Sequence, residues 1–207
     1  MPESKRPLLI GITGNIGSGK SSICRVIEQH GYSVIYADII ADKFLQTMTD
    51  TWVQRWGSDI LSAGKADRAK IAAIVFQNPV ERDFLNAQIH PQVLQEFQRI
   101  IEGSASSQLF FEIPLLFEAG LQDSFDYLIL IKAEREAVLR RVKERDGADY
   151  EATLKRLAAQ IPDSKKEDQV DLVIDNSGSF ENSCDQVRLF LDGLSRIPMR
   201  DVKPMIA

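Results

Sequence analysis

The feature that most constrains the fold is a glycine-rich loop at residues 14–21, which lies between an apolar run and an amphipathic stretch. Its sequence, GNIGSGKS, matches the pattern G-x-x-x-x-G-K-S/T at every position. Residues 8–13 before the loop are typical of a buried strand, and Ile23, Val26 and Ile27 after it recur at helical spacing. A β-branched run at residues 33–36 completes a strand–helix–strand unit, which predicts a parallel sheet covered by helices.

Three later runs extend this sheet. Residues 109–113, 127–131 and 172–175 are short, apolar and bounded by turn or breaker residues, as buried strands are. Five strands that alternate with helices indicate an α/β fold, a P-loop NTPase core with a five-stranded parallel sheet. We expect one kinase-like domain over residues 1–207, because the chain shows no repeat and no low-complexity linker.

Two segments do not belong to this alternating pattern. From about residue 44 to residue 103 no strand is evident and helical patterns dominate, with one pattern ending at His90-Pro91, so we expect an inserted helical lobe on the substrate side. From about residue 140 to residue 168 the chain is helical and rich in Arg and Lys, which fits a lid. Residues 198–207 have no pattern, and we expect a loose tail.

Composition excludes several other classes of protein. The formal net charge is −5, which argues against a nucleic-acid-binding surface over the whole protein. Only two cysteines occur, Cys24 and Cys184, so a disulfide scaffold is excluded. No apolar stretch approaches the roughly 20 residues of a membrane span, and none near the N-terminus reaches the roughly 7 to 15 of a signal peptide. We therefore expect a cytoplasmic protein that binds neither nucleic acid nor membrane; its oligomeric state is open.

The glycine-rich loop carries its own chemistry. Glycines allow tight turns in which successive backbone N–H groups point at phosphate oxygens, and the helix that follows presents its positive end to the same anion. Lys20 can reach the terminal phosphates, and the Ser21 hydroxyl can ligate Mg²⁺. The predicted ligands are therefore ATP and Mg²⁺, and the nucleotide-binding residues of this loop are Gly14, Asn15, Ile16, Gly17, Ser18, Gly19, Lys20, Ser21 and Ser22.

Other features favour a small-molecule kinase over the remaining classes of P-loop protein. A GTPase needs a base-reading Asn/Thr-Lys-x-Asp tetrapeptide, and this chain has none. A motor ATPase needs an acidic residue at a strand end, which Glu112 offers in part. Asp38 follows the second predicted strand, where it could accept a proton from a substrate hydroxyl or simply cap a helix. Arg141 and Arg145 share one helix face, which is either solvated or part of a lid that stabilises the transferring phosphoryl group.

Several short elements, taken in order, resemble the dephospho-CoA kinase family. They are GITGNIGSGKS at residues 11–21, ADIIA at 37–41, IHPQV at 89–93, IPLLFE at 113–118, the region of Arg145 and Gln160, and VIDN at 173–176. They run from about residue 8 to residue 190. The loop is common to many NTPases, whereas the Pro-Leu-Leu-Phe-Glu element and the His-Pro pair are much more specific.

The resemblance implies the last step of coenzyme A synthesis, in which ATP phosphorylates the ribose 3′-hydroxyl of dephospho-CoA. It implies that Lys20 and the loop hold ATP, that Asp38 is the candidate base, that Arg145 belongs to the lid, and that Asn176 lies near the adenine; the predicted catalytic residues are Asp38, Lys20 and Arg145. The residues implied on the acceptor side are Asp38, His90, Pro114, Leu115, Leu116 and Glu118.

This chain departs from the family pattern at three positions. Tyr36 precedes Ala37-Asp38 where an acid is usual, Leu94 stands where Arg is common, and Asn15 stands where Gly is frequent. The alternatives to a dephospho-CoA kinase are another small-metabolite P-loop kinase, such as a shikimate-type enzyme, and a nucleotide-dependent binding module. Shikimate-type chains tend to be shorter and to lack the Pro-Leu-Leu-Phe-Glu element.

Overall fold

A computed structural model of the chain describes residues 6–146 and 150–205, except for the side chains of residues 145, 146 and 152. The described residues form two compact units. We call Met1–Tyr36 with Ser104–Met205 the core unit, and Ala37–Gly103 the helical unit.

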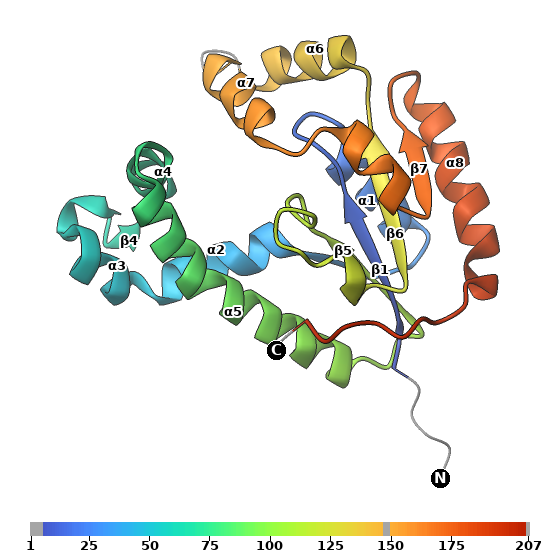
Figure 1. Ribbon diagram of the computed structural model, residues 1–207, viewed down its shortest axis with the longest axis horizontal. Helices are drawn as coiled ribbons and strands as arrows, with labels where there is room; N and C mark the ends of the chain where they lie inside the picture. The colour runs from blue at the N-terminus through green and yellow to red at the C-terminus, as the bar shows by residue number, and fades with distance from the viewer. Residues whose placement is uncertain (1–5, 147–149, 206–207) are drawn as a thin grey trace. The chain divides into compact units, whose positions relative to one another are not determined.

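The core unit is built on a five-stranded sheet in the order β2-β5-β1-β6-β7, with every neighbouring pair parallel (Figure 1). This confirms the predicted α/β class and the five strands. A parallel sheet of this kind collects its ligand-binding loops at the carboxyl ends of its strands. The strands are β1 (Leu8–Thr13), β2 (Val34–Tyr36), β5 (Gln108–Glu112), β6 (Tyr127–Lys132) and β7 (Leu172–Asp175).

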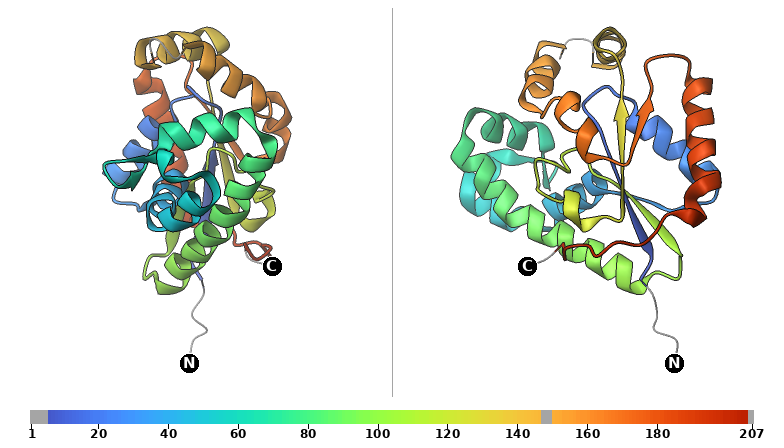
Figure 2. Two further views of the ribbon diagram at one scale, coloured as in Figure 1. Left: turned by 90° about the vertical axis from the view of Figure 1, so that its left-hand side faces the viewer. Right: turned by 45° about the vertical axis from the view of Figure 1, so that its right-hand side comes forward.

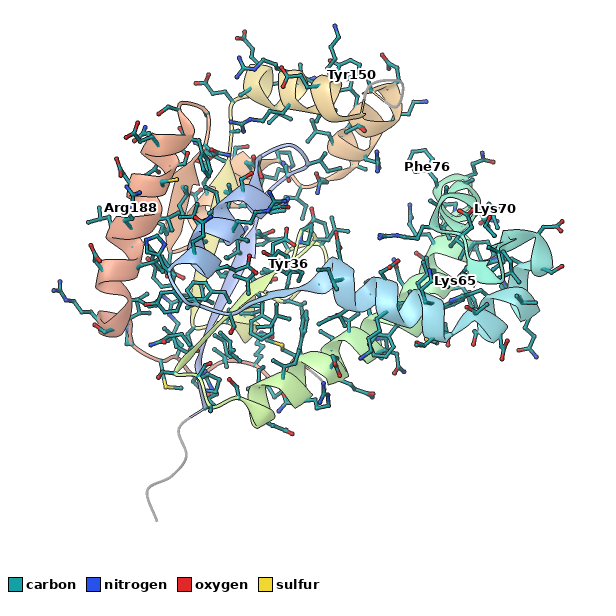
Figure 3. The ribbon with its side chains drawn as sticks, turned by 180° about the vertical axis from the view of Figure 1, so that it is seen from behind. Tyr36, Lys65, Lys70, Phe76, Tyr150 and Arg188 are labelled. Atoms are coloured by element: carbon teal, nitrogen blue, oxygen red, sulfur yellow. The ribbon has the colours of Figure 1, made fainter. Side chains whose placement is uncertain are left out.

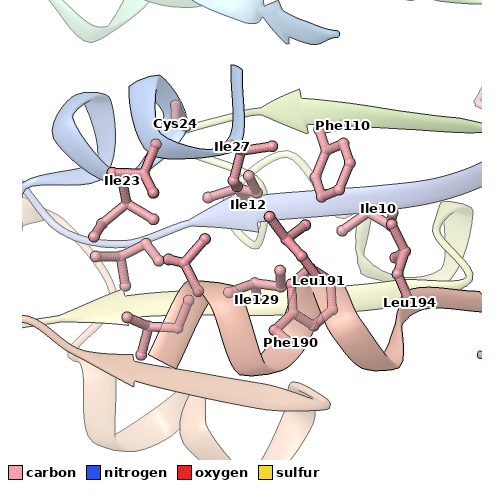
Figure 4. Packing of buried hydrophobic residues seen from close by; sticks show 14 of the residues in the cluster. Ile10, Ile12, Ile23, Cys24, Ile27, Phe110, Ile129, Phe190, Leu191 and Leu194 are labelled. Carbon is pink, nitrogen blue, oxygen red and sulfur yellow. The ribbon is translucent and has the colours of Figure 1, made fainter. Parts of the chain in front are cut away.

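The main hydrophobic core lies where α1 (Lys20–Gln29) and α8 (Phe180–Gly193) pack on this sheet (Figure 4). Ile23 and Ile27, four residues apart on α1, are fully buried against β1. Full burial of an isoleucine side chain contributes about 1.5–3 kcal/mol, so this helix face fixes α1 on the sheet. The loop between β1 and α1 is therefore held at both of its ends.

Helices α6 (Arg135–Asp146) and α7 (Tyr150–Ala159) pack on each other in the core unit, as Figures 1 and 2 show. Two short 3₁₀ helices follow, η4 (Asp163–Lys165) and η5 (Glu167–Gln169), and lead into β7. These elements occupy the region predicted as a lid, residues 140–168, apart from residues 147–149, which lie outside the described part of the chain. Movement of this region stays a prediction.

The expectation of a loose C-terminal tail is wrong for residues 198–205. The backbone N–H of Arg200 donates to Asp126 Oδ1 at 2.6 Å, and its guanidinium pairs with Asp171. Lys203 donates both its backbone N–H and its ammonium to Asp123, and Met205 is buried. The tail has no periodic pattern because side chains from distant segments hold it, rather than a ladder of its own.

The helical unit consists mainly of four helices: α2 (Ala37–Thr47), α3 (Thr49–Trp56), α4 (Arg68–Gln77) and α5 (Pro79–Gly103). Helix α5 packs on both α2 and α4. Trp52 is fully buried, stacks on Trp56 with ring centroids 5.7 Å apart, and meets Phe84 edge-on. Figure 3 shows Lys65, Lys70 and Phe76 projecting from the surface of this unit.

The prediction that residues 44–103 contain no strand is wrong in one place. Strands β3 (Leu61–Ser62) and β4 (Lys65–Ala66) form an antiparallel hairpin. Its turn residues Ala63 and Gly64 have φ angles of 49° and 76°, as a tight two-residue turn requires. Two-residue strands are too short to show an alternating pattern, so the sequence gives no sign of them.

The predicted helix end at His90-Pro91 is also wrong, because α5 continues through Pro91 for 25 residues in all. Proline inside a helix costs about 3 kcal/mol. The buried residues Ile89, Val93, Phe97 and Ile101 recur every four positions on both sides of it. This continuous apolar stripe outweighs the local preference of proline.

Among the described residues, no helix is both long and apolar enough to cross a membrane.

Candidate active site

The glycine-rich loop leaves the end of β1 and needs its glycines for two physical reasons. Gly14, Gly17 and Gly19 all have φ angles between 80° and 151°, a region that L-residues rarely adopt. In addition, a Cβ at Gly14 would lie 2.1 Å from the Ile131 carbonyl oxygen, and one at Gly19 would lie 2.1 Å from Asn176 Nδ2. The loop is thus packed tightly against the ends of β6 and β7.

Lys20 begins α1 and folds back over the loop that precedes it. It is only 9% exposed, and its Nζ donates to the carbonyl oxygens of Gly14 at 2.7 Å and Asn15 at 3.3 Å. Ser21 and Ser22 follow in the first turn and are exposed. The loop and the start of α1 therefore bring an ammonium, backbone N–H groups and hydroxyls to one place, where they can bind an anion.

Asn176, the residue after β7, makes a hydrogen bond to the glycine-rich loop. It is 3% exposed; its Nδ2 donates to the Ser18 carbonyl oxygen at 2.7 Å, and its Oδ1 accepts from Ser183 Oγ at 2.8 Å. The sequence resemblance associates this residue with the adenine. The structure gives its side chain a contact with the loop itself.

Arg141 of α6 reaches the same place. Its Nη2 donates to the Asn176 carbonyl oxygen at 2.7 Å, and its Nη1 lies 3.5 Å from the Ser18 carbonyl oxygen. Arg145 lies in the same helix, but its side chain is outside the described part of the chain. The helical spacing marks both arginines as a pair; it does not show which of them contacts the loop.

The chain that follows α7 contacts both the loop and the segment after β5. Gln160 Oε1 accepts from the Ile16 N–H at 2.8 Å, and the Ile161 N–H donates to Glu118 Oε1 at 2.9 Å. Lys166 is fully buried and donates to Asn15 Oδ1 at 2.8 Å. Sequence reasoning did not select Lys166, because nothing local distinguishes it from its exposed neighbour Lys165.

The Pro-Leu-Leu-Phe-Glu element follows β5 in the core unit. Thr13 Oγ1 donates to the Pro114 carbonyl oxygen at 3.3 Å, which joins this element to the start of the glycine-rich loop. Leu116 is fully buried and belongs to the core, whereas Leu115 is 50% exposed. Of the predicted acceptor-side residues here, Leu115 and Glu118 have the accessible side chains.

Asp38 and His90 lie in the helical unit. Helix α2 begins at Ala37, so Asp38 is an exposed residue of its first turn and not its N-cap. A carboxylate in a first helical turn interacts favourably with the helix dipole. His90 is exposed on α5. Only Ala37 separates Asp38 from Tyr36, the last residue of β2.

Burial controls the protonation of several groups near the loop. Burial raises the pKa of the Cys24 thiol, and the Glu112 carboxylate adds to this effect, so the thiol stays neutral. Cys24 and Cys184 are both free cysteines, as expected for a chain without a disulfide scaffold. Burial also raises the pKa of Asp163 in η4, although the Lys166 and Lys20 ammonium groups oppose the change.

The parallel sheet, the glycine-rich loop on its central strand and the buried lysine at the start of α1 define a P-loop nucleotide-binding protein. A shikimate kinase from Acinetobacter baumannii shares this fold at 14% identity, with a TM-score of 0.50. The family model described as dephospho-CoA kinase matches residues 8–182, and the chain belongs to that family. The family catalyses the final, ATP-dependent step of coenzyme A biosynthesis.

Individual relatives agree with this assignment. A curated dephospho-CoA kinase from Carboxydothermus hydrogenoformans is 37% identical over 194 residues, which cover 88% of this chain and 92% of the relative. One from Thermus thermophilus is 34% identical over 180 residues, covering 87% and 88%. A solved structure from the same organism superposes with a TM-score of 0.81 at 33% identity, covering 92% of this chain and 99% of its own. These matches favour a dephospho-CoA kinase over another small-metabolite kinase.

Proposed function

We propose that this chain transfers the γ-phosphoryl group of ATP to the ribose 3′-hydroxyl of dephospho-CoA. The observation that carries the proposal is the braced phosphate loop, with the Lys20 ammonium folded onto the Gly14 carbonyl oxygen at 2.7 Å. In this assignment the loop N–H groups and Lys20 bind the phosphates of ATP. Lys20 stabilises the negative charge that develops on the transferring group.

Mg²⁺ fits the residues at the start of α1. Ser21 presents an exposed hydroxyl oxygen, the type of ligand that Mg²⁺ accepts alongside phosphate oxygens and water. Among the described residues there is no cluster of three or more His, Cys, Asp or Glu side chains that could hold a metal alone. This is the donor set expected for an ion held jointly by one side chain and the nucleotide. When bound, Mg²⁺ neutralises charge on the β- and γ-phosphates.

Asp38 is the proposed base. Its carboxylate accepts the proton of the 3′-hydroxyl while the ribose oxygen bonds to the γ-phosphorus and the bond from that phosphorus to the β–γ bridging oxygen breaks, releasing ADP. Arg145 adds positive charge to the transferring group. His90, Pro114, Leu115, Leu116 and Glu118 are the proposed acceptor-side residues. Of these, exposed Leu115 suits an apolar part of the acceptor, and Glu118 a polar part.

The experiment is an ATP-consumption assay with dephospho-CoA against a panel of hydroxyl acceptors that includes shikimate and adenosine. We expect turnover with dephospho-CoA to exceed that with the others, and the phosphate to appear on the 3′ position by ³¹P NMR. Turnover with a different acceptor would reassign the substrate. ATP binding without turnover on any acceptor would favour a nucleotide-dependent binding module.

The proposed compartment is the cytoplasm.

A further inference from the structure

Lys166 is the buried lysine that the proposed mechanism does not use. It lies between η4 and η5 in the core unit, and its side chain is 0% exposed. Removing an ammonium group from water is costly unless other groups compensate for its charge and its hydrogen bonds. The contacts of Lys166 therefore show which groups compensate for the burial of its ammonium.

Lys166 joins two segments of the site. Its Nζ donates to Asn15 Oδ1 in the phosphate loop at 2.8 Å and lies 3.6 Å from Glu118 Oε1. Asp163, about one turn earlier in the chain, is a further acidic group close enough to interact with the Lys166 ammonium. Asn15 stands where the family resemblance gives glycine as frequent, and glycine has no side chain with which to make this contact.

The neighbouring contacts make the same connection. Gln160 accepts a hydrogen bond from the Ile16 backbone, next to Asn15, and Ile161 donates one to Glu118. The segment 160–166 is therefore attached twice to the phosphate loop and twice to Glu118. Lys166 contacts both the phosphate loop and Glu118 through a single atom, Nζ. Of the three residues that make these contacts, Gln160, Ile161 and Lys166, it is the one that carries a charge.

We propose that Lys166 is a positioning residue for ATP binding, which acts through Asn15 on the conformation of the phosphate loop. Its second contact ties that conformation to Glu118 on the proposed acceptor side. The inference rests on the proposed function only in assigning the loop to ATP. Lys166 itself is not assigned a contact with the reacting atoms.

The test is a double-mutant cycle on ATP affinity, measured by calorimetry without any acceptor. The variants are Lys166→Met, Asn15→Ala and the two combined. Hydrogen bonds to charged groups are stronger than neutral ones, so we expect Lys166→Met to weaken ATP binding by about 10-fold. Asn15→Ala should weaken it in the same direction, and the combined variant should be no weaker than Lys166→Met alone. Lys165→Met is the matched control, because Lys165 is the adjacent exposed lysine, and it should bind ATP as the unmodified chain does.

Several outcomes would overturn the inference. Unchanged ATP affinity in Lys166→Met with a lower melting temperature would make Lys166 a purely structural residue. Multiplicative losses in the combined variant would show that Lys166 does not act through Asn15. If Lys166→Met fails to fold, Asn15→Ala decides alone, and normal ATP binding in it refutes the proposal.

Failure of the proposed function would look different. A chain that binds ATP normally but does not phosphorylate dephospho-CoA would refute the proposed function while leaving this cycle measurable. Kinetics with dephospho-CoA then add one further readout. We expect the KM for ATP to rise more than kcat falls in Lys166→Met, because positioning of the loop affects bound ATP before any chemistry occurs.

Discussion

Asn176 Nδ2 donates a 2.7 Å hydrogen bond to the Ser18 carbonyl oxygen, and this contact joins the end of β7 to the middle of the phosphate loop. The two groups are buried, and Asn176 is itself held by Ser183. A Cβ on residue 19 would lie 2.1 Å from the same Nδ2, so this contact requires a glycine at position 19. The loop conformation therefore depends on a residue more than 150 positions away in the sequence.

Replacing Asn176 with Ala should weaken ATP binding by about 10-fold. A buried acceptor left without its partner costs roughly 1–3 kcal/mol, and 1.4 kcal/mol corresponds to tenfold in affinity. Calorimetry with ATP measures the effect. Asn182→Ala, an exposed asparagine of α8, is the matched control and should leave the affinity unchanged. Normal affinity in Asn176→Ala would show that the loop holds its shape without this brace.

Lys20→Ala should abolish most turnover while the chain still folds. The ammonium stabilises the transferring phosphoryl group, and loss of such a group typically costs about 10²–10³ in kcat. The Gly14 and Asn15 carbonyl oxygens lose this donor, so the melting temperature should fall by a few degrees while the chain stays folded. Steady-state kinetics and a thermal melt are measured together. Near-normal turnover would remove Lys20 from the mechanism.

Arg145→Ala should lower kcat much more than it weakens binding of dephospho-CoA, if the arginine acts mainly on the transition state. Arg140→Ala provides the control, since Arg140 is an exposed arginine of the same helix. Equal losses in kcat and acceptor affinity would make Arg145 a general binding residue. Kinetics identical to those of Arg140→Ala would make it part of a solvated helix face.

The strands and the phosphate loop could be predicted because their signals are local. A run such as residues 172–175 is apolar, β-branched and bounded by turn residues, and it forms β7 with these same bounds. The hairpin of β3 and β4 and the continuation of α5 through Pro91 could not be predicted. The first is too short to show a period. In the second, apolar residues at helical spacing are visible on both sides of Pro91, but whether they outweigh the proline depends on how completely tertiary packing buries them.

The contacts that Lys166 and Arg141 make at the phosphate loop could not be predicted, for a different reason. Lys165 and Lys166 are identical in type and adjacent in sequence, yet one is exposed and the other fully buried. What separates them is the Asn15 side chain, which approaches Lys166 only in the folded chain. The same holds for Arg141 and its carbonyl partners, because backbone acceptors have no sequence signature.

The anchored tail predicts a specific loss of stability at acid pH. Burial by itself raises the pKa of Asp126, but hydrogen bonds from Arg6 and from the backbones of Leu9 and Arg200 outweigh it, and the net pKa is lowered. A lowered pKa in the folded state gives stability that is full above the unfolded value of about 3.9. That stability is lost as the pH falls through the lower folded pKa.

Asp126→Asn should therefore lower the melting temperature at pH 7 and reduce its dependence on pH below about 4. Asp126 is fully buried but Arg6 is 30% exposed, so the loss should be smaller than the roughly 3–5 kcal/mol of a fully buried pair, and the melting temperature should fall by several degrees. Asp123→Asn is the control, because its partner Lys203 is exposed and surface pairs contribute little. A melting temperature within 2 °C or so of the unmodified chain would show that the contacts of the Asp126 carboxylate add no measurable stability.

The sharpest prediction concerns Asp38, the only carboxylate of the Tyr36-Ala37-Asp38 segment. If Asp38 deprotonates the ribose hydroxyl, Asp38→Asn should lower kcat by about 10²–10⁴, the usual range for a general base, with little change in ATP affinity. The side chain is exposed in the first turn of α2, so the variant should lose no more than a few tenths of a kcal/mol to about 1 kcal/mol of stability through the helix dipole.

Tyr36→Asp, which restores the usual family residue, is the companion measurement. Burial raises the pKa of Tyr36, and the Glu28 and Glu112 carboxylates add to the shift, so an aspartate there meets like charge and should lower the melting temperature. Its turnover should nevertheless change far less than that of Asp38→Asn, because the proposed base that accepts the proton of the ribose hydroxyl is Asp38 and not Tyr36. Both variants are assayed at saturating ATP beside a thermal melt. If Asp38→Asn keeps most of its turnover, Asp38 contributes only to the helix start, and the base is another residue.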